Sequence, residues 1–391
     1  MKIFYNILIL LMILTGCGQK EAVKTRPLGM QAGQSLFSHY YFAILESSER
    51  FDSAAMALYF PSDENQNRQE LFPIDGSNHH LSCLGPTLFR VEGYGKDTLT
   101  IFDLTGTRPL KQFSLLGPDD RARGLFTVAP DQIHFITSDL GLYLRYEDAS
   151  IGVIARSDID SKFVPQYTRT FSLQEFHEGD GNPEIAYIQK VGNKIFVALQ
   201  RLTRTTRGPW LAQNPSMLLE YSLADILKFG TQVKPSRTKQ LFIRNPFGAL
   251  SYDQNFLYVS GVQDFHSRER RFSGVEVVDR ASLDTVRIVL RGKRITKTEV
   301  DGEFLYYFES LEDGTSIIGR FNLVTNEDAP FLKEDISASV SDMVLTPDQR
   351  LWVTTEGNDR ALYRIDLTSL EVRKVATYNL FPRTLTLCSG Q

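Results

Sequence analysis

A repeated pair of short strands dominates the chain after residue 35 and limits the folds that it can adopt. In each copy, a turn rich in Gly, Asp or Asn precedes a strand of apolar and aromatic residues. The copies are GPTLFRV from Gly85, GNKIFVAL from Gly192, DQNFLYVS from Asp253, DGEFLYYF from Asp301, DQRLWVTT from Asp348 and, with one residue fewer, PDQIHFIT from Pro130. A second, alternating strand follows, as in LTIFDLTG and SIIGRFNLVTN. With MALYFPSDEN added, we identify about seven such units.

The spacing of these units predicts an all-β fold. Their starts lie roughly fifty residues apart, which is typical of four-stranded propeller blades with some enlarged loops. We therefore predict a closed β-propeller of about seven blades over residues 36–391. A ring covers both faces of every small sheet, which explains why closure is favourable. A pair of β-sandwich domains is the alternative, and the single repeat period argues against it. The main helical pattern is SLADILKF from Ser222.

The first unit lacks an innermost strand, and the C-terminus could supply it. HYYFAIL, AAMALYF and RQELFPI account for only three strands, whereas RTLTLCSG near the end of the chain has no other place. This closure would put Cys388 on the innermost strand of the first blade and Cys83 on that of the second. We expect a disulfide between them in an oxidising compartment; two unpaired thiols are the alternative.

The N-terminus has the profile of an export signal. Lys2 precedes a run from Ile3 to Leu14 that is apolar except for Tyr5 and Asn6 and is shorter than the ~20 residues that a membrane span needs. The signal ends in Leu14-Thr15-Gly16-Cys17, which resembles the lipobox of bacterial lipoproteins. That resemblance implies removal of residues 1–16 and lipidation of the Cys17 sulfur. An ordinary secretory signal with a chance cysteine is the alternative.

The residues after Cys17 predict how the protein is held at the membrane. Residues 17–35 contain few apolar side chains and form a tether in our interpretation. Lipoproteins kept at the inner membrane of many Gram-negative bacteria carry Asp at the position of Gly18, so its absence favours the outer membrane. We expect a lipid-anchored protein of the bacterial cell envelope.

The composition is that of an ordinary globular protein. The chain has 391 residues, of which 42% are hydrophobic and 23% charged, and its net charge is −4. Nothing in this balance indicates a nucleic-acid partner, and an anion-binding surface would have to be a local patch.

Several segments resemble a known repeat. LWVTTEGNDRALYRIDLTSLEVRKV from Leu351, and LYVSGVQDF with GVEVVDRASLDTVRIVL, resemble the YVTN-type repeat of lactonase-like bacterial propellers. The resemblance implies a fold and not an activity, because propellers host unrelated functions. Lactonase-like propellers can hold a metal in the central channel with acidic and amide side chains, but those ligands cannot be matched here residue by residue.

The sequence contains no familiar catalytic motif. A G-x-S-x-G elbow, HExxH, a Cys-rich zinc pattern, a P-loop and a dinucleotide fingerprint are all absent. The adjacent His79 and His80 are interpreted as a turn-exposed pair rather than a metal site. The loop HEGDGNPE places Glu178, Asp180, Asn182 and Glu184 at alternating positions that could suit Ca²⁺. It lacks the full EF-hand pattern, so we assign it no metal.

Two enlarged loops are the most informative local feature. RLTRTTRGPW carries Arg201, Arg204, Arg207 and Trp210, and QDFHSRERRF carries Phe265, His266, Arg268, Arg270, Arg271 and Phe272. Both are predicted to connect the second and third strands of adjacent blades, which would place them on one face. Guanidinium groups bind phosphates and carboxylates, and aromatic rings add apolar contact. We predict a basic ligand-binding patch; solvated loops are the alternative.

These observations favour a non-enzymatic protein. We expect a lipid-anchored binding or assembly scaffold for an envelope protein or for an anionic glycan or lipid, with no catalytic residue and no cofactor. The alternative is a lactonase-like hydrolase with a divalent metal in the central channel. A small sugar or peptide bound in that channel is a third option.

Overall fold

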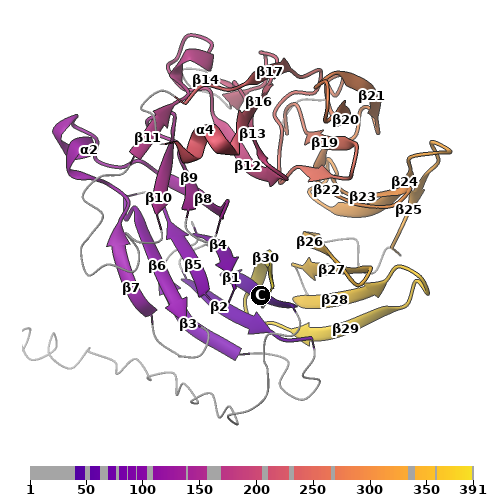
Figure 1. Cartoon of the computed structure of the whole chain (residues 1–391). Helices are drawn as coiled ribbons and strands as arrows, with labels where there is room; N and C mark the ends of the chain where they lie inside the picture. The colour runs from indigo at the N-terminus through magenta and orange to yellow at the C-terminus, as the bar shows by residue number, and fades with distance from the viewer. Residues whose placement is uncertain are drawn as a thin grey trace, which may run out of the picture.

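The computed structural model shows a β-propeller and confirms the predicted fold class (Figure 1). The structure describes residues 40–389 apart from 49–52, 62–68, 76–78, 86, 94, 104–108, 138–139, 156–168, 205–209, 229–232, 266–268, 333–339 and 357–358. The predicted signal peptide, Cys17 and the tether therefore lie outside the described residues.

Seven four-stranded antiparallel sheets form the ring. We number these blades along the chain and call the strands of each A to D, from innermost to outermost. Blade 1 consists of β30 (Phe381–Ser389), β1 (Tyr40–Ser47), β2 (Ser53–Tyr59) and β3 (Gln69–Asp75). Blade 2 consists of β4 (His79–Leu84), β5 (Thr87–Glu92), β6 (Thr98–Asp103) and β7 (Pro109–Ser114). Blade 3 consists of β8 (Pro130–Phe135), β9 (Leu140–Arg145), β10 (Ser150–Ala155) and β11 (Arg169–Ser172).

The remaining blades follow the same order. Blade 4 consists of β12 (Ile185–Val191), β13 (Lys194–Leu199), β16 (Met217–Ser222) and β17 (Arg237–Gln240), and blade 5 of β18 (Ser251–Tyr252), β19 (Phe256–Gly261), β20 (Gly274–Asp279) and β21 (Thr285–Val289). Blade 6 consists of β22 (Ile295–Asp301), β23 (Phe304–Ser310), β24 (Ser316–Asn322) and β25 (Asp328–Pro330). Blade 7 consists of β26 (Val340–Thr346), β27 (Arg350–Thr355), β28 (Ala361–Asp366) and β29 (Val372–Thr377). A small hairpin of β14 (Thr203–Arg204) and β15 (Trp210–Leu211) extends blade 4.

The two ends of the described chain close the ring as predicted. Strand β30 pairs antiparallel with β1, with Cys388 opposite Tyr41, and the yellow and indigo strands lie side by side in Figure 1. Cys388 forms a disulfide with Cys83 of β4, and their Cα atoms are 5.4 Å apart. The disulfide prediction is therefore confirmed, and the bond joins the A strands of blades 1 and 2.

Apolar side chains from neighbouring blades fill the spaces between the sheets. The fully buried Trp352 of blade 7 packs 4.8 Å from Phe42 and 5.6 Å from Tyr59 of blade 1, measured between ring centroids. Burying aromatic rings of this size is a major favourable term in folding. Blade 6 requires glycine at position 319, where the Tyr307 ring of the neighbouring strand lies close to the backbone. A Cβ at Gly319 would lie 2.0 Å from Cζ of its cross-strand partner Tyr307.

The structure corrects one strand assignment and confirms a helix. PDQIHFIT was aligned with the B strands, but it forms β8, the A strand of blade 3, and β9 is the B strand. The SLADILKF segment does contain a helix, α4 (Leu223–Leu227), and a second short helix, α2 (Pro118–Ala122), precedes blade 3. In the described part of the chain, no helix has the length and apolarity needed to cross a membrane.

Candidate functional site

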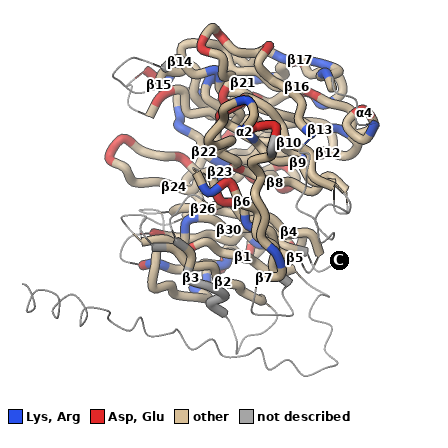
Figure 2. Tube along the Cα trace, turned by 90° about the vertical axis from the view of Figure 1, so that its left-hand side faces the viewer, with Lys and Arg blue, Asp and Glu red and all other residues tan. Residues whose placement is uncertain are grey.

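One face of the ring carries all the connections from strand B to strand C and from strand D to the next blade. Successive strands of a blade run antiparallel, so these two kinds of connection emerge together and the others emerge opposite. Figure 2 shows β14 and β15 of a B-to-C connection on one side and α4 of a C-to-D connection on the other. We call the first side the loop face. The two enlarged loops both lie on it, because they connect β13 to β16 and β19 to β20.

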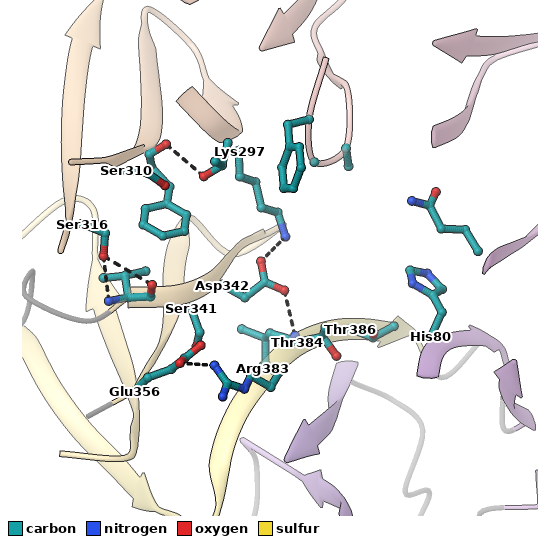
Figure 3. Close-up of a pocket in the computed structure, with 18 of the residues that line it drawn as sticks. His80, Lys297, Ser310, Ser316, Ser341, Asp342, Glu356, Arg383, Thr384 and Thr386 are labelled. Carbon is teal, nitrogen blue, oxygen red and sulfur yellow. Dashed lines mark hydrogen bonds and ion pairs between the residues drawn. The ribbon is translucent and has the colours of Figure 1, made fainter. Parts of the chain in front are cut away.

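A cavity of about 640 Å³ lies at the channel mouth on the loop face (Figure 3). Its wall includes A-strand side chains and loop residues such as Phe247, Phe265 and Glu356. A second cavity of about 380 Å³ shares Gln132, Phe247 and Gly248 with the first. The two cavities therefore adjoin one another around the mouth of the channel.

Two ion pairs form part of the cavity wall. Nζ of Lys297 lies 2.5 Å from Oδ1 of Asp342, whose Oδ2 accepts the Leu385 N–H at 2.8 Å. Burial would lower the pKa of Lys297, but the carboxylates of Asp342 and Glu299 outweigh burial and raise it. Arg383 forms the second ion pair with Glu356. In each ion pair, the positive and the negative side chain neutralise each other within the protein.

The two histidines that we expected in an exposed turn lie elsewhere, so that interpretation is wrong. Both belong to β4, where neighbouring side chains point in opposite directions. His79 is buried, whereas His80 lines the cavity and points into it in Figure 3. The His80 ring lies 6.2 Å from that of His134 on β8. Burial lowers the pKa of His80 to about 4 and that of His134 to about 3, so both rings are neutral at neutral pH.

The alternative of a divalent metal in the central channel is not supported by a ligand cluster among the described residues. They contain no group of three or more His, Cys, Asp or Glu side chains that could hold a metal ion. The Asp342 carboxylate is occupied by Lys297 and by the backbone N–H groups of Met343 and Leu385.

The acidic loop before β12 is held by its own hydrogen bonds. The Asp180 and Asn182 side chains accept the backbone N–H groups two residues further on, and Asn182 Nδ2 donates to the Tyr146 carbonyl at 2.8 Å. Glu184 is fully buried; its Oε2 accepts the Leu202 N–H at 2.8 Å, while Oε1 has no partner in the described part of the chain. Burial raises the pKa of Glu184 to about 8, which makes it a neutral acid at neutral pH.

The predicted basic patch is described only in part. Arg207, His266 and Arg268 lie outside the described residues, and Arg204 is placed by its backbone alone. Arg201 is a positioning residue of the loop, because it donates to the Phe176 and Pro215 carbonyls and pairs with Glu178.

The other predicted residues also make contacts within the protein. Arg270 pairs with Glu312 at 2.6 Å, and the Arg271 guanidinium lies 5.2 Å from the centre of the Phe272 ring. Trp210 leaves 41% of its surface exposed. The described arginines are thus partly neutralised or stacked, while the tryptophan remains accessible.

Exposed aromatic rings on the loop face were not all anticipated from the sequence. Four Phe and Trp residues are exposed among the described residues, and all four belong to loop-face connections. They are Phe126 (93% exposed), Trp210 (41%), Phe247 (41%) and Phe265 (39%). Phe126 follows Leu125 after the polar stretch PDDRARG, and Phe247 lies in the short segment RNPFGAL. A large apolar residue within a polar or Gly- and Pro-containing loop was the available signal.

Comparisons with known proteins support the fold. No protein-family model matches the chain, and no curated protein matches it. A candidate 6-phosphogluconolactonase from Bacteroides fragilis superposes with a TM-score of 0.59 at 11% identity, covering 90% of this chain and 97% of the other. A second, from Bacteroides uniformis, gives 0.58 at 11% identity and covers 89% and 99%. At such identity the similarity shows a shared β-propeller fold and leaves the activity open.

Proposed function

We propose that this protein is a lipid-anchored binding module of the bacterial cell envelope, which captures a protein partner on its loop face. The observation that carries the proposal is the distribution of the exposed Phe and Trp rings, while the exposed Tyr252 lies on the opposite face. All the exposed Phe and Trp residues among those described lie on this one face. Aromatic residues and arginine are enriched where proteins bind one another, and they often dominate the binding energy.

The charges of the loop face favour a protein over an anionic lipid or glycan. Arg201 and Arg270 are paired with Glu178 and Glu312. A surface of mixed charge with apolar rings between the charges matches the polar rim and apolar centre of a protein interface. The sequence features at Cys17 and in residues 17–35 support a tethered position at the membrane, with the outer membrane favoured.

Capture from solubilised native envelopes tests this function. We expect the double variant F126S/W210S to lose about tenfold or more of the captured partner, because truncation of interface aromatics is costly. The matched control is Tyr252→Ser, since Tyr252 is 43% exposed and is the last residue of β18, at the end of this A strand that faces away from the loop face. Equal capture by the double variant and the wild-type protein would contradict the proposal.

Charge reversal separates the two kinds of ligand. If an anionic glycan or lipid is the true ligand, reversing Arg204, Arg207, Arg268 and Arg270 should abolish capture and raised salt should do the same. If a protein is bound through the aromatic rings, the reversal should slow association and leave much of the affinity.

A further inference from the structure

The charged side chains in the wall of the channel-mouth cavity are paired with one another. The two ion pairs, Lys297 with Asp342 and Arg383 with Glu356, cancel within the wall. A charged ligand would have to compete with these partners, and separating a partly buried ion pair is costly. The two histidines are neutral rings and add no charge at neutral pH.

The same wall offers hydrogen-bonding groups at fixed positions. The His80 ring lines the cavity, and a neutral imidazole presents both a donor and an acceptor. Gln132 is fixed by the Ala186 carbonyl and by the His134 ring, 3.1 and 3.2 Å away. Oγ1 of Thr384 is buried and has no hydrogen-bond partner among the described residues. Such positioned polar groups give a binding site its specificity.

An apolar rim completes the cavity. The rings of Phe247 and Phe265 meet edge to face with their centres 5.4 Å apart, and each is about two-fifths exposed. They belong to connections of blades 4 and 5, so two separate parts of the chain build this rim. An exposed aromatic face offers apolar contact to a flat ligand that enters the mouth.

From this combination we propose that the channel mouth binds an uncharged saccharide unit, either as a free mono- or disaccharide or as the end of a longer glycan. A sugar ring presents apolar C–H faces that can pack against Phe247 and Phe265. Its hydroxyl groups both donate and accept, which suits neutral imidazole, amide and hydroxyl side chains together with the outer atoms of the ion pairs. The volume of about 640 Å³ lies in the range of small-molecule sites.

This site does not depend on the capture of a protein by the loop face. Phe126 belongs to the connection between β7 and β8 and does not line the cavity, whereas Phe247 does. Loss of saccharide binding and loss of partner capture can therefore be told apart with single variants.

Calorimetric titration of the full mature protein in phosphatidylcholine vesicles provides the test. The probes are the neutral disaccharides maltose, cellobiose, lactose and chitobiose, with glucose 6-phosphate and uncharged N-acetyl-trialanine amide as comparisons. We expect at least one disaccharide to bind in the micromolar to millimolar range, about tenfold or more tightly than the phosphate ester and the peptide.

Variants place the binding at the channel mouth. Phe247→Ala, which changes an exposed side chain, should weaken saccharide binding about tenfold. Phe126→Ala, on the same face but outside the cavity, should leave it unchanged. Saturation-transfer NMR should show contact with the C–H protons of the sugar. No binding of any disaccharide up to about 10 mM, tighter binding of the peptide or the phosphate ester, or an unchanged affinity in Phe247→Ala would each overturn the proposal.

Discussion

The guanidinium of Arg145 binds the carboxylate of Asp120 through two parallel hydrogen bonds of 2.7 and 3.1 Å. Arg145 is the last residue of β9 and is fully buried, while Asp120 lies on α2 in the connection that carries Phe126. Asp148 also accepts from Arg145, at 2.6 Å. These hydrogen bonds therefore fix the connection that carries Phe126, the most exposed ring of the loop face, onto blade 3.

We predict that Asp120→Asn is destabilising. Arg145 would keep Asp148 as its remaining carboxylate partner, and weakening hydrogen bonds to a buried charged group costs about 1.5–3 kcal/mol. Urea unfolding checks the free energy, and Asp119→Asn is the control because Asp119 is exposed on the same helix. Equal stability of the two variants would show that this contact does not hold the loop.

Acid should weaken the same contact. Burial alone would raise the pKa of Asp120, but hydrogen bonds from Arg145, the Gly117 N–H and Arg123 outweigh it and hold the pKa below its ordinary value. A lowered carboxyl pKa contributes stability that is present above the unfolded-state value of about 4 and is lost as the pH falls below it. The Asp120→Asn variant should therefore lose less stability than wild type between about pH 5 and pH 2.

The Cys83–Cys388 bond should contribute much of the resistance of the ring to unfolding. It links positions 305 residues apart, and removing a disulfide that closes a long loop typically costs about 2–5 kcal/mol. A reductant should lower the urea midpoint of the wild-type protein and leave that of C83A/C388A unchanged. The double variant should still fold, because β30 keeps its pairing with β1. A wild-type midpoint that does not respond to reductant, once thiol titration shows full reduction, would contradict this prediction.

The raised pKa of Glu184 predicts that the protein loses stability as the pH becomes alkaline. This pKa rises from 4.5 to about 8 on folding, so the native state binds a proton that the unfolded state has released between these values. The contribution is complete below about pH 4.5 and is lost as the pH rises toward 8. Glu184→Gln should remove this dependence and stabilise the protein above pH 8 by about 1–3 kcal/mol. The exposed Glu175→Gln is the control, and parallel stability curves for wild type and Glu184→Gln would refute the assignment.

Lipid attachment at Cys17 is tested by labelling. Cys17→Ser should abolish incorporation of labelled palmitate and move the protein from the membrane fraction to the soluble fraction, because the acyl chains supply the membrane affinity. Labelling of the variant at the wild-type level would remove the proposed anchor.

The sequence predicted the architecture because blade strands alternate and recur. The pairing of β30 with β1 followed from a missing strand in one unit and a spare strand at the C-terminus. PDQIHFIT was misplaced because A and B strands share the same apolar pattern, so only tertiary pairing distinguishes them. His80 was misjudged because whether a strand side chain faces solvent or the channel depends on neighbouring blades. The channel-mouth cavity could not be predicted, since it combines residues from several blades.

Site-specific photocrosslinking in living cells tests the central claim most directly. A photoreactive phenylalanine analogue is placed at Phe126, Trp210 or, on the opposite face, Tyr252. We predict that the first two positions crosslink to the same envelope protein and that the third does not. Crosslinks to that protein from Tyr252 alone, or none from Phe126 and Trp210, would contradict binding on the loop face.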